Sequence, residues 1–332
     1  MAISNDLLSS TLYAIRDSEV DQLFRKTAFL DLIKSSGGIE YEDGGIKVQR
    51  PLSVVDHSTI TQLATGYEPV SLAVSDVLKP AVYDWSDFVA PIVITAKEEL
   101  ENNGEKAIVK ILEARMKNVM GMLKRELNKQ ILAGTSTTLT TMSSLNGFTL
   151  TNGFLEEGAA APATQTNIVG GLQKSVLNVP GWYNSRLQST GAANIVDDLT
   201  SLYQECNQFS PFGDVKAVIV NPLTFASYKS ALFANERFMS ADKLDGGRLQ
   251  LAFAGAVVEQ DNEMPTNGGA GNQYSAYMLN FEGIKMVIHS DADFALSPME
   301  HVSGTTARSA NLYFKGQLIA DHLRGSGVLF GL

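Results

Sequence analysis

Residues 83–100 read YDWSDFVAPIVITAKEEL and carry the clearest signal of local structure in the sequence. Apolar side chains alternate with polar ones through its first part, a pattern that predicts a half-buried strand. Thr95 then precedes Glu98 by three residues, which is the spacing of a capping box at a helix N-terminus. The stretch therefore predicts a strand that passes straight into a helix.

The predicted helix covers residues 96–133. Its apolar side chains recur three or four residues apart, at Leu100, Ile108, Ile111, Leu112, Met116, Val119, Leu123, Leu127 and Ile131. Acidic residues gather near its start and basic residues near its end, as the helix dipole favours, and Gly134 ends it. A straight helix of this span is about 57 Å long, and Asn102-Asn103-Gly104 is the place where it could bend. We therefore expect a spine that crosses the whole subunit.

Residues 41–90, ahead of this helix, predict a long two-stranded ribbon. Strand-like alternation flanks a polar middle, residues 53–69, that is rich in Ser, Thr, Asp and Gly. The segment is too long for an ordinary connection, and a ribbon of two strands is only marginally stable by itself. We therefore expect something outside the chain to hold the ribbon, with His57–Glu68 as its tip.

The N-terminal segment, residues 6–34, has apolar residues at helical spacing and predicts one or two amphipathic helices that stop at Gly37 and Gly38. The first residues carry no basic and apolar signal for secretion. The sequence has no run of 18 apolar residues that could span a bilayer. We therefore expect a soluble protein made in the cytosol.

The C-terminal half alternates predicted helices and strands. The expected helices are residues 194–208 and the segment that Asn221-Pro222 opens and Phe233 ends; the expected strands lie in 215–220, 248–262, 274–296 and 309–330. The fold class is therefore α+β with a mixed sheet.

Composition narrows the function classes. The chain has 332 residues, 44% of them apolar, and a formal net charge of −10; its mean hydropathy is −0.01. These values exclude a disordered chain, and the acidity argues against a free-standing nucleic-acid binder. The single cysteine, Cys206, forms no internal disulfide and is expected to be a buried small apolar residue.

The sequence predicts no catalytic, cofactor-binding or metal-binding residue. Its histidines, at positions 57, 289, 301 and 322, match no metal or catalytic motif, and no phosphate-binding loop or nucleophile elbow is present. Asp291 and Asp293 could face one ligand, but a third ligand at suitable spacing is missing. The aromatic cluster Tyr83-Trp85-Phe88 has few basic residues near it, so core or subunit-contact packing is expected in place of base stacking.

The order of these elements resembles the major capsid protein of tailed bacteriophages, with the Hong Kong 97-like shell fold. Three stretches carry the resemblance: Tyr83–Leu100, like the family's passage from extended loop to spine helix; Ala217–Phe225, like its strand, Asn-Pro turn and helix; and Leu251–Leu279, like its strand, Met-Pro loop and returning strand. The resemblance implies an N-terminal arm (1–38), an extended loop (39–92), a peripheral domain (93–190) with the spine helix (96–133), an axial domain (191–300) and strands returning to the peripheral domain (301–332).

The resemblance also implies a structural role and no enzyme activity. The expected protein self-assembles as pentamers and hexamers into an icosahedral head around double-stranded DNA, without sequence-specific DNA contact and without a membrane. A separate scaffolding protein and a portal are expected partners, and a cementing or decoration protein is a possible one. The expected location is the virion capsid, assembled in the host cytoplasm.

Other family features are matched only by position. Some members join subunits through a Lys–Asn isopeptide bond; Lys47 and Lys79 lie in the loop segment, but no acceptor Asn with a nearby carboxylate matches either, so no cross-link is expected. Arg50 and Arg237 are expected to pair with acidic neighbouring subunits. Either 235–247 or 262–272 is expected near the ring axis.

Three alternatives remain open at the level of sequence. An encapsulin-type shell around cargo enzymes would share the fold. A soluble α/β enzyme would need a converging catalytic set and would leave the ribbon unexplained. A decoration or tail protein would not call for the spine helix.

Overall fold

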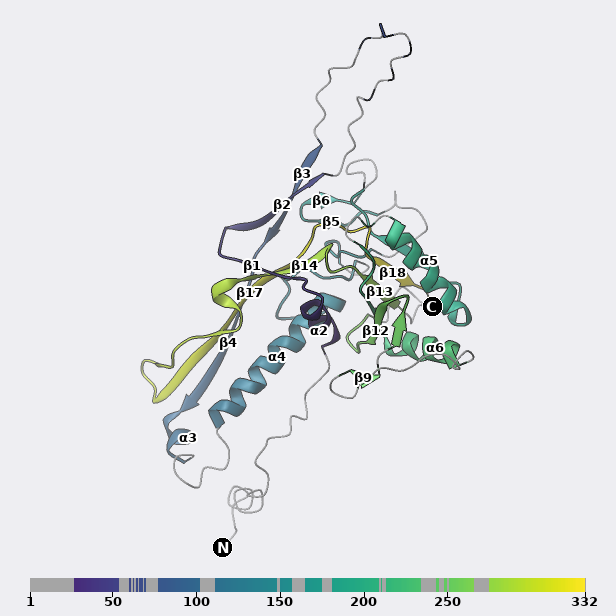
Figure 1. Ribbon diagram of the computed structural model, residues 1–332. Coiled ribbons are helices and arrows are strands. Elements are labelled where there is room, and N and C mark those ends of the chain that lie inside the picture. The colour runs from purple at the N-terminus through teal and green to yellow at the C-terminus, as the bar shows by residue number, and fades with distance from the viewer. Residues whose placement is uncertain are drawn as a thin grey trace.

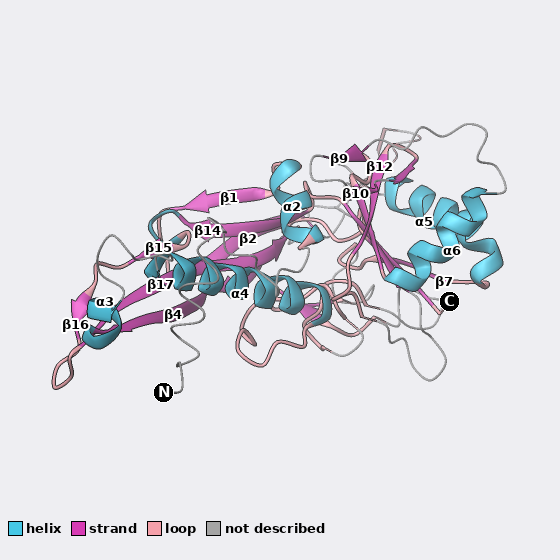
Figure 2. Ribbon diagram, turned by 90° about the horizontal axis from the view of Figure 1, so that it is seen from below, coloured by secondary structure: helices cyan, strands magenta, loops and turns pink. Residues whose placement is uncertain are grey.

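The computed structural model of the chain shows two β-sheets with helices packed on them (Figures 1 and 2). The residues that it describes are 27–53, 60, 62, 64, 66, 67, 69, 77–101, 111–147, 150–156, 165–174, 181–208, 210, 213–233, 243, 244, 248, 249, 251–265 and 275–331. Within them, no helix is long and apolar enough to cross a membrane.

The helices in the described part are α2 (Ala28–Ser35), α3 (Ala96–Glu101), α4 (Ile111–Ala133), α5 (Ile195–Gln208) and α6 (Pro222–Phe233), with the short 3₁₀ turns η2 (Ala192–Asn194) and η4 (Ser290–Ala292). The strands are β1 (Ile39–Glu42), β2 (Lys47–Ser53), β3 (Leu78–Asp84), β4 (Ser86–Thr95), β5 (Ile168–Val169), β6 (Leu172–Gln173), β7 (Ser185–Gln188), β8 (Ala217–Val220), β9 (Lys243–Leu244), β10 (Arg248–Leu249), β11 (Leu251–Phe253), β12 (Ala256–Gln260), β13 (Ser275–Leu279), β14 (Ile284–His289), β15 (Ala295–Leu296), β16 (Glu300–His301), β17 (Ala307–Ala320) and β18 (Gly327–Phe330). The expected α+β class is confirmed.

The first sheet is built around the long strand β17. One edge of β17 pairs with β4 along its length, and the other edge pairs in turn with β14, β15 and β16; β1 extends the sheet beyond β14. Phe88 of β4 stacks on Phe314 of β17, and both belong to the core that also holds Leu123 and Leu127 of α4. The helix α4 therefore covers this face of the sheet, as Figure 2 shows.

The predicted passage from strand to helix is confirmed. β4 ends at Thr95 and α3 begins at the next residue. The N–H and the hydroxyl of Thr95 both donate to Glu98 Oε2, at 3.1 and 3.0 Å, and the N–H of Glu98 points back to Thr95 Oγ1 at 3.4 Å. These are the contacts of a capping box. Residues 102–110, where the bend was expected, lie outside the described residues.

The second sheet is mixed and has the order β11-β12-β8-β13-β18-β7. Its central strand β8 is buried on both faces, as the apolar run at 215–220 predicted. Val218 and Val220 pack with α5 and α6, whereas Ala217 and Ile219 face the main core. The helices expected at 194–208 and after Asn221-Pro222 are confirmed as α5 and α6.

The chain passes between the two sheets three times, after β4, after β13 and after β17. β14, in the expected axial segment 191–300, pairs with β17 in the first sheet. β18, in the expected return segment 301–332, pairs with β13 and β7 in the second sheet. Alternation along a strand reports which side chains are buried, but it carries no information on the partner strand.

The helix α2 is part of the core of the subunit. Ala28, Phe29 and Ile33 are fully buried, and the Phe29 ring meets the Phe281 ring edge to face, with 5.9 Å between centroids. Residues 28–35, within the expected arm 1–38, therefore pack their apolar face inside the same chain. Residues 1–26 lie outside the described part.

The predicted ribbon is present as β2 and β3, which pair antiparallel from Lys47 opposite Asp84 to Ser53 opposite Leu78. It projects from the body in Figure 1. It occupies less than the segment 39–92, because β1 and β4 at the ends of that segment belong to the first sheet. Most of the expected tip, His57–Glu68, lies outside the described residues.

Candidate assembly surfaces

The base of the ribbon is supported by its own chain. One face of the ribbon is buried through Val48, Leu52, Ala81 and Tyr83. The N–H of Val82 donates to the carbonyl of Gly170, in the turn between β5 and β6, at 2.9 Å. The expectation that only something outside the chain holds the ribbon is therefore wrong for its base.

Gly170 is needed for this approach. Its φ is +58°, and a Cβ there would lie 2.8 Å from the Ala81 side chain and 2.9 Å from the Tyr83 ring. Glycine alone combines the left-handed backbone with the absence of that atom. The turn between β5 and β6 can therefore lie directly against the ribbon.

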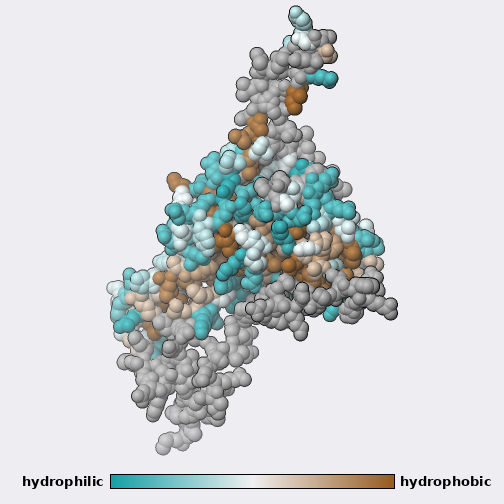
Figure 3. Space-filling view, in the orientation of Figure 1, coloured by the Kyte–Doolittle hydropathy of each residue, from teal (hydrophilic) through white to brown (hydrophobic). Residues whose placement is uncertain are grey.

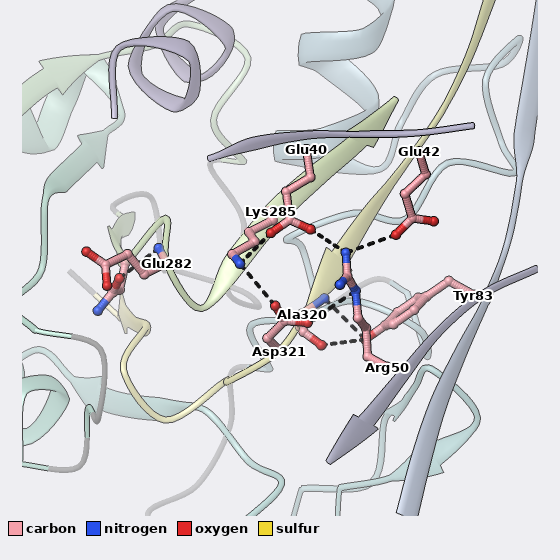
Figure 4. Close-up of polar contacts among 9 residues, drawn as sticks. Glu40, Glu42, Arg50, Tyr83, Glu282, Lys285, Ala320 and Asp321 are labelled. Carbon is pink, nitrogen blue, oxygen red and sulfur yellow. Dashed lines mark hydrogen bonds and ion pairs between the residues drawn. The ribbon is translucent and has the colours of Figure 1, made fainter. Parts of the chain in front are cut away.

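A cluster of charged residues ties the ribbon to the first sheet (Figure 4). Arg50 of β2 pairs with Glu40 of β1, and its Nη2 lies 3.2 Å from Glu42 Oε1. Lys285 of β14 lies 2.6 Å from Glu40 Oε1 and 3.4 Å from Asp321 Oδ2. These five residues, here called the ribbon clamp, come from β1, β2, β14 and the end of β17.

The clamp changes the pKa values of its members. Burial alone would raise the pKa of Glu40, but the hydrogen bond from Lys285 and the charge of Arg50 outweigh it, so the pKa of Glu40 is lowered. Burial would lower the pKa of Lys285, but its bonds to Glu40 and Asp321 raise it. Arg50 was expected to pair with a neighbouring subunit; it is instead engaged within its own chain. Arg237 lies outside the described residues.

The most exposed large apolar side chains in the described part of the chain lie on or beside the ribbon. Ile60 and Tyr67 are 92% and 97% exposed, and Ile46, next to the base of the ribbon, and Leu78, at the outer end of β3, are also exposed. Figure 3 shows separate apolar patches on the ribbon, and further apolar surface on the body. Covering large apolar side chains with a partner removes much apolar surface from water, which favours association. The ribbon is therefore a candidate contact surface.

A second apolar surface lies on the face of the first sheet that points away from α4. Val89 and Val93 of β4 and Tyr313 of β17 are exposed there, and Tyr313 sits opposite Val89 in the register. In the described part β4 pairs with β17 alone, so β4 is an edge strand. A long exposed edge offers unpaired backbone groups to a further strand.

The exposed face beside this edge is made by Val89, Val93 and Tyr313, and we call these three residues the outer sheet face.

The aromatic cluster at 83–88 is confirmed as packing residues. Tyr83 and Phe88 are buried, and Trp85 donates from its Nε1 to the carbonyl of Gly45 at 3.0 Å. Lys315 lies 5.7 Å from the centre of the Trp85 ring. Cys206 is likewise buried, and burial raises the pKa of its thiol to about 12.

The histidines in the described part stand on separate elements. His289 ends β14, His301 ends β16, and His322 follows β17, where burial and the charge of Arg324 lower its pKa to about 4. His57 lies outside the described residues. Among the described residues, no group of three His, Cys, Asp or Glu could hold a metal ion.

The remaining sequence candidates have ordinary surface contacts. Asp293 accepts from the Tyr41 hydroxyl at 3.0 Å, and the N–H of Asp291 donates to His289 Nδ1 at 3.2 Å. Lys47 pairs with Asp84 across the ribbon at 2.8 Å. Of the two segments expected near the ring axis, 235–247 is described only at 243 and 244, and 262–272 only as far as 265.

The ribbon clamp and the outer sheet face had no distinct sequence signal. The clamp joins residues up to 281 positions apart, from Glu40 to Asp321, so its partners are set by the topology of the sheets. The only local hint was the alternation of acidic residues at 40 and 42 on one strand, which places both carboxylates on one face.

Comparison with known proteins supports one fold. No family model and no curated protein matches the sequence. The capsid of cyanophage A-1(L) is similar in structure with a TM-score of 0.62 and 13% identity, over 98% of this chain and 97% of that chain. The holo-SrpI encapsulin complex of Synechococcus elongatus PCC 7942 is similar with a TM-score of 0.61 and 10% identity, over 100% of this chain and 96% of that chain. The capsid of Myoviridae phage XM1 is similar with a TM-score of 0.55 and 11% identity, over 100% of this chain and 99% of that chain.

These similarities extend over nearly the full length of each chain. The proteins named here are the capsids of two phages and an encapsulin complex. The chain therefore has the Hong Kong 97-like capsid fold, as the order of its elements predicted.

Proposed function

We propose that this protein is the major capsid protein of a tailed bacteriophage. In this proposal it assembles as pentamers and hexamers into an icosahedral head around double-stranded DNA, and it is located in the virion. The observation that carries the proposal is the projecting ribbon, whose described outer residues Ile60 and Tyr67 are almost fully exposed, on a full-length capsid fold. In a shell, such residues would be buried on a neighbouring copy.

The proposed parts follow the topology. The first sheet with α4 would form the peripheral domain, the second sheet with α5 and α6 the axial domain, and residues 1–26 the arm. A separate scaffolding protein and a portal would be the partners, a cementing protein is a further candidate partner, and assembly would take place in the host cytoplasm. The protein would need no catalytic residue, because its role is to form contacts with copies of itself.

An encapsulin-like shell around cargo enzymes is the second candidate. The observation that favours it is the similarity to the holo-SrpI encapsulin complex, whose TM-score of 0.61 nearly equals the 0.62 of the cyanophage capsid. The two candidates share the fold and differ in what the shell encloses. The contents of assembled particles therefore distinguish them.

The test is electron microscopy of the purified protein, expressed alone and together with its neighbouring genes. We expect closed particles or rings of five and six subunits. DNA-filled heads with tails would support the phage proposal, whereas particles holding a protein cargo would support the encapsulin candidate. A protein that stays monomeric under every condition would contradict both.

A shortened ribbon tests the assembly role directly. Ser53 and Leu78 are paired at the end of the described ribbon, so an Asn-Gly turn can replace residues 54–77 without changing the register. We expect a folded subunit, with the circular dichroism of the parent, that no longer assembles. Normal particles from this variant would contradict the contact role of the ribbon.

A further inference from the structure

The carboxylate of Asp261 connects three elements of the fold. Asp261 follows β12 and is 2% exposed. Its Oδ2 accepts from the backbone N–H of Ala28 at 3.1 Å and from Asn128 Nδ2 at 2.9 Å, and its Oδ1 accepts from the N–H of Glu263 at 2.9 Å. One side chain therefore fixes the start of α2 to α4 and to the end of a strand of the second sheet.

The surroundings of this carboxylate favour its uncharged form. Burial raises the pKa of Asp261, the hydrogen bonds from Glu263, Asn128 and Ala28 oppose this rise, and the negative charge of Glu263 adds to it. The charged residues with described side chains on the elements packed around it are Asp31 and Lys34 of α2, Arg115, Lys117, Lys124, Arg125, Glu126 and Lys129 of α4, and Glu259 and Glu263 in and after β12. Among the described residues, the charge that acts on the pKa of Asp261 is that of Glu263.

The partner amide has an unused acceptor. Asn128 is 1% exposed, and within the part of the chain that the structure describes its Oδ1 is buried without a hydrogen-bond partner. An ionised Asp261 can only accept, so Asn128 must present its Nδ2 to it. A protonated Asp261 carries one O–H donor, which is the group that Asn128 Oδ1 lacks.

We propose that Asp261 and Asn128 form a proton-operated latch on α2. With Asp261 ionised, its Oδ2 holds the Ala28 N–H, and α2 is fixed between α4 and the second sheet. With one proton taken up from solvent on Oδ2, the side-chain amide of Asn128 turns over so that its Oδ1 takes the place of its Nδ2. The new O–H of Asp261 then donates to Asn128 Oδ1, and the hold on Ala28 weakens. The O–H bond formed with the proton from solvent is the only covalent change in this exchange.

The position of α2 gives the latch a wider effect. Phe29, next to Ala28, packs on Phe281 where the chain crosses from β13 to β14, between the two sheets. A weakened start of α2 would loosen this crossing. The latch acts within one subunit, so it does not depend on the proposed shell function.

The test is hydrogen–deuterium exchange measured by mass spectrometry on the full-length subunit. Labelling times are scaled for the intrinsic exchange rate between about pH 7.5 and about pH 4.5. We expect the scaled exchange of the peptide covering residues 27–38 to rise about tenfold over this range, while that of α5 stays constant. D261N, which imitates the protonated carboxyl, should show the fast exchange at both pH values.

E263Q is the matched control, because it neutralises a carboxyl two residues away whose side chain makes none of the three contacts. It should keep the pH dependence of α2, with the midpoint moved to lower pH because the repelling charge is gone. Exchange of residues 27–38 that does not change with pH in the parent protein would overturn the latch. So would a D261N protein in which α2 and α5 are both as protected as in the parent. If α5 also loses protection in D261N, the variant is destabilised as a whole. The pH dependence of exchange at residues 27–38 in the parent protein then tests the latch by itself.

Discussion

The hydroxyl of Tyr83 makes two hydrogen bonds with the backbone of Ala320. It donates to the Ala320 carbonyl at 3.1 Å and accepts from the Ala320 N–H at 3.2 Å. Tyr83 lies on the ribbon strand β3, and Ala320 is the last residue of β17. This pair therefore joins the ribbon to the long strand at the centre of the first sheet (Figure 4).

Y83F removes both hydrogen bonds and leaves the buried N–H and carbonyl of Ala320 without them. We expect the free energy of unfolding to fall by about 1–3 kcal/mol, which is the usual cost of leaving a buried polar group unsatisfied. Urea denaturation of the subunit measures this. Y67F is the control, because Tyr67 is 97% exposed, and it should change stability by less than about 0.5 kcal/mol. Equal stability of Y83F and Y67F would contradict the role of the pair.

E40Q tests the ribbon clamp. The folded-state pKa of Glu40 is lowered, so its ion pairs stabilise the protein above the ordinary pKa of 4.5 and this contribution is lost as the pH falls through the folded-state value. Glu40 and its partners are a quarter to a third exposed, so we expect a loss of only about 1 kcal/mol near neutral pH. The loss should shrink at high salt and at low pH. A difference between the urea midpoints of parent and E40Q that is the same at about pH 7 and about pH 3 would contradict this assignment.

The local structure could be predicted wherever one short stretch held all the needed information. The capping box at Thr95 and Glu98, the buried strand 217–220 and the helix opened by Pro222 each depend on neighbouring residues, and the structure has them as expected. The ribbon was predicted for the same reason, since a polar middle between two strand patterns is a local signal.

The tertiary placement of these elements could not be predicted in the same way. That β14 belongs to the first sheet and β18 to the second depends on pairing partners far along the chain. Arg50 looked like a surface charge, and only the approach of β1 and β14 supplies its partners within the chain. The helix α2 was predicted, but its burial within its own chain was not, because an amphipathic helix has the same pattern whether its own chain or a neighbour covers it.

Two glycine substitutions separate backbone entropy from close packing. Gly121 lies inside α4, and a Cβ there would meet nothing within 4 Å, so G121A should raise the free energy of unfolding by about 0.5–1 kcal/mol. Gly153 differs, because a Cβ would lie 2.0 Å from the carbonyl oxygen of Asn146. We expect G153A to lower stability by about 1–3 kcal/mol. Urea denaturation measures whether the free energy of unfolding rises in G121A and falls in G153A. A stabilised G153A would show that the backbones of residues 146 and 153 do not make this close contact.

K174M tests a buried amine that supports the turn against the ribbon. Lys174 is fully buried, and its Nζ donates to Asn184 Oδ1 at 2.9 Å and to the carbonyl of Phe154. Burial lowers its pKa to about 7, against a raising effect of Glu156. Between pH 10.5 and about pH 7 the lysine is protonated in the unfolded state but neutral in the folded state. The free energy of unfolding therefore falls as the pH is lowered through this range, and below about pH 7 the effect of Lys174 is constant. K174M loses two hydrogen bonds but removes this pH dependence. We expect it to be less stable than the parent, with a larger difference between the two proteins at about pH 9.5 than at about pH 7. Urea midpoints at the two pH values measure this, and K34M, at an exposed lysine, is the control that should show no such change. A difference that is the same at both pH values would mean that the Lys174 amine keeps its ordinary pKa in the folded protein.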